Sequence, residues 1–305
     1  ERTEVTIEQS NDKCSSTKTP KFLKLIAMNT DNCCTISCEN PLDKQYWDAQ
    51  YQANNTAWDI GTVSPPIQSY IDTIEDKSIR ILIPGCGNSY EAEYLLQKGF
   101  TNVTLIDIAP KLIENLQKKF DKNPNITIVL GDFFEHQGEY DLIIEQTFFC
   151  ALPPFLRQRY VWKMHQLLSQ KGILAGLLFN TTFEVSPPFG GSKAEYELLF
   201  KDAFRFLHLE PCMNSIPQRA NSELFMEFKR NNLVFVNLYN FQGMSCTTCK
   251  DAITDKFQAI EGVMNVSISS NFSEVLLVSA HKIPLKKLQS TISYEAKYAI
   301  SEINY

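Results

Sequence analysis

The sequence lacks a long hydrophobic run: none approaches the ~20 apolar residues that a membrane-spanning helix needs. The N-terminal stretch has no apolar core of the kind that marks a secretory signal. Positive charge is not in excess either, because 29 Lys and Arg residues face 35 Asp and Glu residues, for a formal net charge of −6. This charge gives no general attraction to nucleic acid or to an anionic membrane. We expect a cytoplasmic protein that works on small molecules.

Cysteines are too few and too scattered for a disulfide framework: there are 9 in 305 residues, an odd number. Cys246 and Cys249 stand in a CxxC motif, and Cys86 lies in a glycine-containing turn. This distribution is typical of reduced, cytosolic thiols. In the polar arm at the start of the chain, three cysteines form a cluster that we interpret as incidental thiols rather than a metal site: Cys33, Cys34 and Cys38.

The chain divides by composition into three parts. Residues 1–39 are rich in Ser, Thr, Asn and Lys and have no sustained hydrophobic period, so we expect them to be mostly disordered. The sequence begins at Glu1, and Met28 is a candidate for the true start. The remaining length is enough for two ordinary domains, which we place at residues 40–231 and 233–305.

In the first of these domains, short apolar runs alternate with helical patterns. The runs predict strands at 79–84, 103–107, 126–130, 140–145 and 172–179. The helical patterns lie at 89–98, 110–120 and 155–169. This alternation predicts an α/β domain with a mostly parallel, doubly wound sheet, whose ligand lies beyond the carboxyl ends of the strands.

The pattern restarts after Asn231. A strand, a loop and helix, two strands, a second helix and a last strand follow one another in the remaining residues. The order β-α-β-β-α-β in so short a segment predicts a small α+β domain of the ferredoxin-like type. The boundary falls near Asn231 and Asn232, with hardly any linker.

The first strand runs directly into a glycine turn and a helix. Gly85 and Gly87 allow a tight turn whose backbone N–H groups face a nucleotide-like ligand. Tyr90 occupies the place of the third glycine of the dinucleotide fingerprint, which disfavours a pyrophosphate. Asp107 ends the second strand, where an acid accepts hydrogen bonds from ribose hydroxyls.

The later strand ends carry acidic and aromatic residues. Asp132 and Phe133 follow the third strand, where they can pair with and stack on an adenine. Glu145 and Asp141 lie in the fourth strand, and strand capping or a ligand contact is favoured over acid–base catalysis for both. The histidines of this domain show no triad spacing: His136, His165 and His208.

Three aromatic residues lie close together before the first strand: Trp47, Tyr51 and Trp58. They are either buried anchors for the N-terminal segment or an aromatic lid over a cationic ligand, since ring faces attract a sulfonium or ammonium group. The segment itself does not distinguish these interpretations.

Five segments together resemble the thiopurine S-methyltransferase family, including its plant thiol and halide methyltransferases: WDAQY…NNTAWDIG, ILIPGCGNSYEAEYL, VTLIDIAP, GDFF and EQTFFCALPPFLRQRY. The resemblance covers residues 43–230. It implies a Rossmann-like, class I methyltransferase domain that uses S-adenosylmethionine (SAM). It also implies a set of cofactor-binding residues: Trp47, Trp58, Gly85, Gly87, Asp107, Asp132, Phe133 and Gln146.

The same resemblance bears on the methyl acceptor. Arg157 matches a recurrent basic residue, for which substrate binding and a surface ion pair are equally favoured. Gln146 stands where the thiopurine-acting branch has arginine and the plant branch tyrosine, which disfavours a thiopurine. A methyl group leaves a sulfonium by in-line displacement, so alignment and exclusion of water matter most. A soft nucleophile such as a thiol, sulfide, halide or metalloid needs little or no base, and we assign no catalytic acid or base.

The C-terminal domain resembles the heavy-metal-associated domain of metallochaperones and metal-transporting ATPases, through GMSCTTC, EGVMNVSIS and KYAISEI. The resemblance implies that Cys246 and Cys249 bind a soft metal ion. A helix N-terminus lowers thiol pKa values, and two thiolates suit Cu(I), Zn(II) or Hg(II). The alternatives are thioredoxin-like redox chemistry, which lacks its surrounding pattern, and a degenerate domain that binds no metal.

The sequence thus predicts a SAM-dependent methyltransferase fused to a soft-metal-binding domain. One rival is a metallochaperone whose first domain is a non-catalytic scaffold. A second rival, a nicotinamide-dependent oxidoreductase, is supported by the GxG turn and Asp107 and opposed by Tyr90 and the GDFF segment. The methyl acceptor, the metal, communication between the two sites and the oligomeric state are not specified by these motifs.

Overall fold

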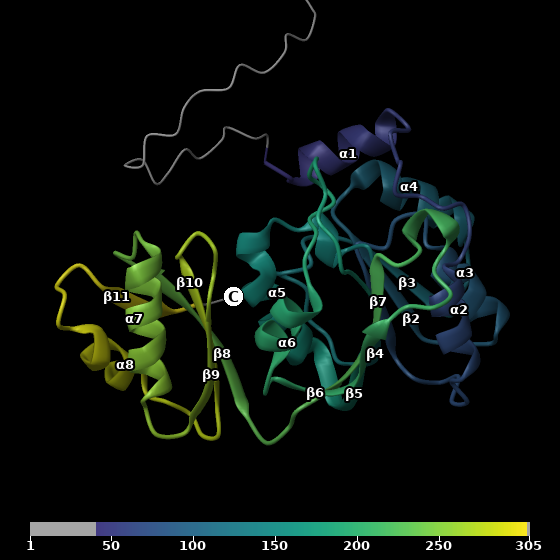
Figure 1. Cartoon of the computed structure of the whole chain (residues 1–305). Helices are drawn as coiled ribbons and strands as arrows, with labels where there is room; N and C mark the ends of the chain where they lie inside the picture. The colour runs from purple at the N-terminus through teal and green to yellow at the C-terminus, as the bar shows by residue number, and fades with distance from the viewer. Residues whose placement is uncertain (1–40, 304–305) are drawn as a thin grey trace, which may run out of the picture. The chain divides into compact units, whose positions relative to one another are not determined.

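The computed structural model describes residues 41–303, which belong to one compact unit and form two sheets (Figure 1). A seven-stranded sheet spans residues 81–230, and a four-stranded sheet spans residues 235–302. The change from one sheet to the other falls between Arg230 and Phe235, and the division into two domains stays a prediction. The expected disordered arm (1–39), the candidate start (Met28) and the clustered cysteines of the arm (Cys33, Cys34 and Cys38) lie outside the described residues.

The seven-stranded sheet has the order β3-β2-β1-β4-β5-β7-β6. Its strands are β1 (Ile81–Pro84), β2 (Val103–Asp107), β3 (Ile126–Leu130), β4 (Tyr140–Gln146), β5 (Leu168–Phe179), β6 (Phe204–Pro211) and β7 (Glu223–Arg230). The first five are parallel, whereas β7 runs antiparallel to both β5 and β6. The strand order reverses between β1 and β4, and such a reversal is where open α/β sheets bind their ligands.

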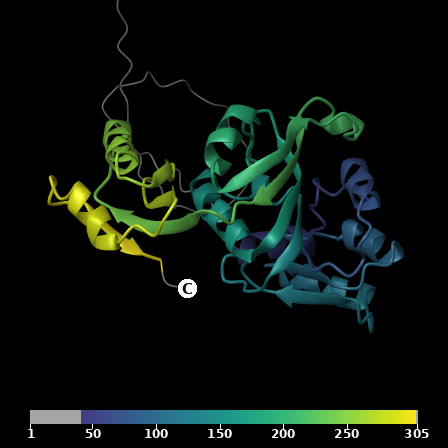
Figure 2. The ribbon, with the colours of Figure 1, turned by 90° about the horizontal axis from the view of Figure 1, so that it is seen from below.

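Helices cover both faces of this sheet (Figures 1 and 2), as a doubly wound fold requires. One face carries α2 (Pro65–Asp72), α3 (Tyr90–Gln97) and α4 (Pro110–Lys119). The other carries α5 (Arg157–Leu167) and α6 (Lys193–Phe200). The short α1 (Lys44–Gln52) packs against α4. Three single-turn 3-10 helices complete the domain: η1 (Phe149–Ala151), η2 (Pro154–Leu156) and η3 (Pro217–Arg219).

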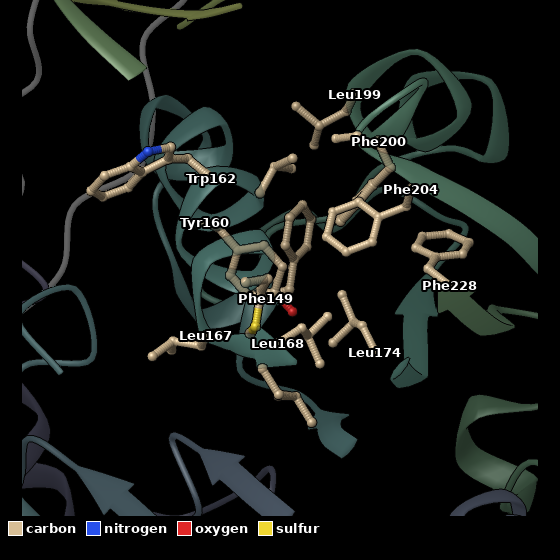
Figure 3. Packing of buried hydrophobic residues seen from close by; sticks show 14 of the residues in the cluster. Phe149, Tyr160, Trp162, Leu167, Leu168, Leu174, Leu199, Phe200, Phe204 and Phe228 are labelled. Atoms are coloured by element: carbon tan, nitrogen blue, oxygen red, sulfur yellow. The ribbon is translucent and has the colours of Figure 1, made fainter. Parts of the chain in front are cut away.

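Aromatic side chains fill the core on the α5 face (Figure 3). Tyr160 of α5 is fully buried, and its ring centroid lies 4.9 Å from that of Phe149 in η1. Phe200 of α6 joins them, at 6.2 Å from Phe149 and 5.1 Å from Phe228 of β7. This packing fixes the segment after β4 against α5, and that segment borders the site described below.

The second sheet has the order β11-β8-β10-β9 with every neighbouring pair antiparallel. Its elements follow the predicted β-α-β-β-α-β order: β8 (Phe235–Gln242), α7 (Thr247–Gln258), β9 (Val263–Ile268), β10 (Glu274–Ser279), α8 (Leu285–Ile292) and β11 (Ala299–Glu302). Both helices pack on one face, where Ile253, Phe257 and Leu288 are fully buried.

The other face of the small sheet packs against α5. Leu238, Leu276 and Val278 belong to the same buried cluster as Tyr160. Arg159 forms an ion pair with Glu274, whose side chain is 4% exposed. Gln158 donates a 3.0 Å hydrogen bond to Ser267 and a longer one to the Ile268 carbonyl. Helix α5 is therefore part of both cores.

Candidate functional site

The glycine turn after β1 needs glycine for two reasons. Gly85 (φ +54°) and Gly87 (φ +51°) both have left-handed backbone conformations, which glycine adopts at least cost. A Cβ atom on Gly85 would also lie 2.2 Å from the Phe148 ring. The turn ends at Ser89, which precedes α3, so its N–H groups and the helix N-terminus face the same space.

Asp107 lies beside this turn. The register pairs Pro84 with Ile106, which brings the end of β2 level with the end of β1. The Asp107 carboxylate accepts hydrogen bonds from the N–H groups of Gly87 (3.4 Å) and Ala109 (3.0 Å). The residue is 8% exposed, and burial raises the pKa of its carboxyl to about 6. It is thus a preorganised acceptor at the turn.

The two residues after β3 differ in their surroundings. Asp132 is exposed and accepts a 2.8 Å hydrogen bond from the Phe134 N–H, which closes its own turn. Phe133 is buried at 5% exposure, with its ring centroid 5.1 Å from that of Phe148. Phe133 therefore packs within the core. Its ring contacts Phe148, and Phe148 in turn contacts Gly85.

The N-terminal aromatic residues gather over the glycine turn. The ring centroid of Trp58 lies 5.5 Å from that of Trp47 and 5.8 Å from that of Tyr51. The Tyr51 hydroxyl lies 3.6 Å from where a Cβ on Gly87 would stand. Burial raises the Tyr51 pKa, and the nearby charge of Asp107 adds to the effect. Both interpretations of this aromatic group agree with its half-buried position.

Polar contacts that we did not predict tie this arm to the sheet. Asp59 accepts hydrogen bonds from Asn88 and from Tyr90, which links the arm to the glycine turn. Arg219 donates a 3.0 Å hydrogen bond to the Trp58 carbonyl and pairs with Glu223 at 3.5 Å. Asp59 lies in the WDIG segment that carries the family resemblance, but nothing in the sequence connects that segment with Arg219, some 160 positions later.

The turn after β4 forms the opposite side of the site. The register pairs Leu82 with Ile143, which brings Glu145 level with the end of β1. Glu145 is fully buried, and its next neighbour Gln146 has a buried Oε1 without a hydrogen-bond partner. Phe148 completes the turn against Gly85. A polar acceptor is thus left available beside the glycine turn.

Arg157 lies at the start of α5, with its side chain 6% exposed. It forms an ion pair with Glu195 and donates a 2.6 Å hydrogen bond to the Gly190 carbonyl. The guanidinium also lies 5.0 Å from the Phe149 ring centre. These contacts hold the segment before α6 close to the turn after β4.

The histidines and the remaining candidate acid have partners of their own. His136 bonds the Tyr140 hydroxyl at 2.7 Å, His165 bonds the Asn231 carbonyl at 3.1 Å, and His208 pairs with Glu227 at 3.6 Å. Asp141 forms an ion pair with Arg80, which lowers the pKa of its carboxyl to about 2. Asp141 is therefore committed to a structural ion pair.

The CxxC motif lies at the N-terminus of α7, and its state corrects our expectation of reduced thiols. Cys246 and Cys249 form a disulfide, with their Cα atoms 5.2 Å apart. The physical reason is the spacing, because residues three apart in the first turn of a helix lie on one face. Within residues 41–303, no group of three or more His, Cys, Asp or Glu side chains could hold a metal ion. The other described cysteines are unpaired and buried: Cys86, Cys150 and Cys212.

These residues suit a nucleoside ligand that carries a positive charge. The glycine turn offers N–H groups, Asp107 an acceptor, Gln146 an unpaired amide oxygen and Trp58 an aromatic ring. SAM carries a sulfonium cation, which aromatic ring faces attract. It also carries a ribose, whose hydroxyls an acidic side chain can bind. The fold and the site thus define the class of Rossmann-like, SAM-dependent methyltransferases.

Comparison with known proteins identifies the family. Residues 42–231 match the model of the family described as thiopurine S-methyltransferase, and the chain belongs to that family. It is 33% identical over 157 residues to probable thiol methyltransferase 2 of Arabidopsis thaliana, covering 50% of this chain and 69% of the relative. It is 28% identical over 190 residues to thiopurine S-methyltransferase of Acinetobacter baylyi, covering 53% and 86%.

Among solved structures, the chain resembles the 1,6-didemethyltoxoflavin-N1-methyltransferase of Burkholderia thailandensis with bound 1,6-didemethyltoxoflavin and S-adenosylhomocysteine (SAH). The TM-score is 0.51 at 16% identity, covering 62% of this chain and 87% of the other. This likeness supports the fold. The family match and its named relatives establish a SAM-dependent methyltransferase of the thiopurine and thiol S-methyltransferase kind. Across the described range, no helix has the length and apolar character needed to cross a membrane.

Proposed function

We propose that this enzyme transfers a methyl group from SAM to a small soft nucleophile: a thiol, sulfide, a halide or a metalloid. The proposal depends on one observation: the acidic side chains at the strand ends already accept hydrogen bonds from the protein itself. Asp107 accepts two main-chain hydrogen bonds, and Glu145 accepts three from Tyr160, Phe148 and Phe149. A nucleophile that is already anionic near neutral pH needs neither group as a base.

The relatives favour the same chemistry. One is named a probable thiol methyltransferase and another, from Arabidopsis thaliana, thiocyanate methyltransferase 1, at 27% identity over 193 residues. Sulfur is the nucleophilic atom of a thiol. Gln146 brings a neutral amide to the acceptor side, where the thiopurine-acting branch of the family has arginine, and this difference disfavours a thiopurine.

We assign the following roles to the residues of this chain. Asp107 accepts hydrogen bonds from the ribose hydroxyls, and the N–H groups of the Gly85–Gly87 turn face the amino-acid part of the ligand. Trp47 and Trp58 cover the sulfonium. When bound, SAM supplies the activated methyl group. Asp132 and Phe133 are our candidates for binding the adenine. Phe133 contributes by supporting Phe148, against which its ring packs.

On the acceptor side, we assign Gln146 and Arg157. The unpaired Gln146 oxygen accepts a hydrogen bond from bound ligand. Arg157 remains a candidate for acceptor binding, although its bonds to Glu195 and Gly190 favour a role in holding the segment before α6 over the site. Closing that segment would exclude water from the reacting atoms.

The direct test measures SAH release by the reduced, full-length protein. The acceptor panel contains sulfide, small thiols, iodide, a thiopurine, and selenium, tellurium and arsenic oxyanions with a reductant. We expect turnover on the thiol or sulfide arm and loss of turnover in Asp107→Ala. Turnover confined to the thiopurine, or none despite SAM binding, would overturn the soft-nucleophile assignment.

For the C-terminal domain we propose soft-metal binding by Cys246 and Cys249 in a ferredoxin-like, heavy-metal-associated fold. The β-α-β-β-α-β order and the position of both sulfurs at the start of α7 support it. The Cys249 N–H donates to the Cys246 sulfur at 3.2 Å, a contact that favours a thiolate once the disulfide is reduced. A metal therefore requires prior reduction of the pair.

Titration of the reduced full-length protein with Cu(I), and separately with Zn(II), tests this assignment. We expect one equivalent to bind, and none in Cys246→Ser with Cys249→Ser. Binding retained by the double variant would move the site to other thiols of the chain. If SAM fails to bind while metal does, the rival metallochaperone interpretation gains the advantage.

We also propose a cytoplasmic location, because a reducing compartment keeps Cys86, Cys150 and Cys212 as thiols and allows the CxxC pair to open. Fractionation of cells followed by thiol trapping measures both properties together. An extracellular protein with a permanently oxidised CxxC pair would contradict the location and the metal assignment.

A further inference from the structure

Glu145 is a carboxyl group with no exposure to solvent, at the end of β4. One of its oxygens accepts hydrogen bonds from the N–H groups of Phe148 (2.7 Å) and Phe149 (2.9 Å). The other accepts a 2.6 Å hydrogen bond from the Tyr160 hydroxyl of α5. Burying a carboxyl group is costly unless its oxygens are bonded, so three donors directed at one group hold it in a single orientation.

These bonds hold a turn that would otherwise be unfavourable. Thr147 has φ +62°, a left-handed conformation that is strained for a β-branched residue. Such strain persists only where the surroundings over-determine it. Glu145 bonds the backbone immediately after Thr147, and the Cys150 thiol donates back to the Thr147 carbonyl at 3.2 Å. The carboxylate therefore acts as the fixed point around which the turn closes.

The turn in question borders the cofactor side of the site. Phe148 packs so closely on Gly85 that only glycine fits beneath its ring. Gln146, with its unpaired buried oxygen, lies between Glu145 and the strained Thr147. A shift of this turn would move both Phe148 and Gln146 relative to the glycine turn. Methyl transfer is sensitive to such shifts because its three reacting atoms must align.

We propose that Glu145 is a positioning residue for methyl transfer: through the N–H groups of Phe148 and Phe149, and anchored by Tyr160, it sets where the turn at 146–149 meets the bound methyl donor. The assignment rests on the proposed methyl transfer from SAM and not on which acceptor binds. Glu145 does not touch the ligand, because its oxygens are occupied by protein donors.

The experiment compares three variants of the full-length protein. Glu145→Ala removes all three bonds, Tyr160→Phe removes one, and Glu145→Gln keeps an amide oxygen that can accept both N–H groups. We expect kcat/KM for sulfide or a small thiol to fall about 100-fold in Glu145→Ala. Tyr160→Phe should lie in between, and Glu145→Gln should recover most of the activity. The Kd for SAH should change less than about threefold throughout. Glu75→Gln, an exposed acid far from these contacts, is the matched control.

Two results would overturn the proposal. One is kcat/KM unchanged within twofold in Glu145→Ala, whatever happens to its melting temperature, because that would make the group merely structural. The other is equal damage in Glu145→Ala and Glu145→Gln, since the amide should rescue a positioning role. If Glu145→Ala does not fold, the other two variants still test the proposal. A fall in kcat/KM of more than twofold in Tyr160→Phe, with near-wild-type activity in Glu145→Gln, would support it, and wild-type activity in Tyr160→Phe would overturn it.

A separate measurement distinguishes failure of this proposal from failure of the proposed acceptor. If the wild-type protein methylates nothing in the panel, the soft-nucleophile assignment fails, and amide hydrogen exchange then tests Glu145. SAH should slow exchange of the Phe148 and Phe149 N–H groups in the wild type and in Glu145→Gln. Exchange that SAH leaves unchanged in the wild type would overturn the link between this turn and the ligand.

Discussion

The two sheets of this molecule present their candidate sites in opposite ways. The seven-stranded sheet gathers Gly85, Asp107 and Glu145 from the ends of three parallel strands, across 60 positions of sequence. The four-stranded sheet presents its site within four consecutive positions, Cys246–Cys249, at the start of one helix. A site of the first kind depends on strand register, whereas a site of the second kind depends on local helix geometry.

The electrostatics of the two sites differ for the same reason. Burial raises the pKa of Asp107 to about 6 and that of Glu145 to about 7, and in each case hydrogen bonds oppose the shift. The burial comes from packing against neighbouring strands and helices, whereas several of the opposing hydrogen bonds are local: Ala109 donates to Asp107, and Phe148 and Phe149 donate to Glu145. The two cysteines are only half-buried, and their main polar contact is within α7 itself. Tertiary packing therefore tunes the first site, and the helix N-terminus tunes the second.

One helix connects the two regions. On α5, Tyr160 bonds Glu145 in the large sheet, while Gln158 and Arg159 bond residues of the small sheet. The comparison then raises a clear question: whether the regions are independent in stability, in ligand affinity and in activity. Four predictions address it.

The largest effect should come from ending the chain after Arg230. This change removes the buried side chains that cover α5: Leu238, Leu276 and Val278. Burying one such side chain stabilises a protein by about 1.5–3 kcal/mol. We expect the remaining domain to melt at least about 10 °C lower than the full chain, if it stays soluble.

The control for the truncation is Leu233→Ser in the full chain, because Leu233 lies in the connection and is 86% exposed. Thermal unfolding followed by circular dichroism compares the three proteins. A truncated domain that melts within 2–3 °C of the full chain, a difference worth about 1 kcal/mol, would mean that α5 needs no cover and that the two regions are independent.

The next effect concerns the large sheet alone. Asp107→Ala removes the acceptor for the ribose hydroxyls, and we expect SAH to bind about 1.5–3 kcal/mol more weakly. Isothermal titration calorimetry measures the change, with the exposed Asp121→Ala as control. An unchanged Kd would refute the ribose role. Metal binding at the CxxC pair should be the same in both variants.

The same residue predicts a pH dependence of binding. Because burial raises the pKa of Asp107 to about 6, the carboxylate is mostly ionised at pH 7 and mostly protonated at pH 5. Only the ionised form accepts from both hydroxyls, so we expect SAH affinity to fall about tenfold from pH 7 to pH 5. Asp107→Asn should bind weakly and equally at both values. A wild-type affinity that is flat with pH would contradict the assigned role.

The smallest effect should come from the CxxC pair on methyl transfer. Cys246→Ser with Cys249→Ser removes a half-buried disulfide on the side of the small sheet that faces away from α5. We expect kcat/KM to stay within twofold of the wild type, assayed by SAH release with and without reductant. Cys212→Ser, a buried thiol in the large domain, is the comparison. A tenfold change in the double variant would show that the two sites communicate.

Local patterns predicted most of the secondary structure. The second and third strands have the bounds expected from their apolar runs, 103–107 and 126–130. The fifth strand begins at Leu168, four positions before its predicted start, and shortens the helix before it. Residues 168–171 are mixed in polarity, and pairing of Leu168 with Tyr140 draws them into the sheet. No periodicity of the chain encodes that pairing.

Two aspects of the site could not be predicted from the residues in order. The GDFF motif predicts Phe133 as an adenine contact, but no pattern predicts that its ring packs against Phe148 and Phe134. Arg219 lies in a polar connection without any motif, yet it bonds the Trp58 carbonyl. Both outcomes depend on which segments the fold brings together.

The sequence by itself determined the features that depend only on residues close together in the chain. Apolar periodicity set the strands and helices, glycine at positions 85 and 87 set the turn, and the CxxC spacing brought two sulfurs to one helix face. Tertiary structure alone decided the antiparallel placement of β7, the burial of Glu145 beneath the Phe148 turn, and the sharing of α5 by two cores. These features depend on contacts between segments that are far apart in the sequence. Such contacts stabilise the protein only after the chain between them has lost the entropy of loop closure.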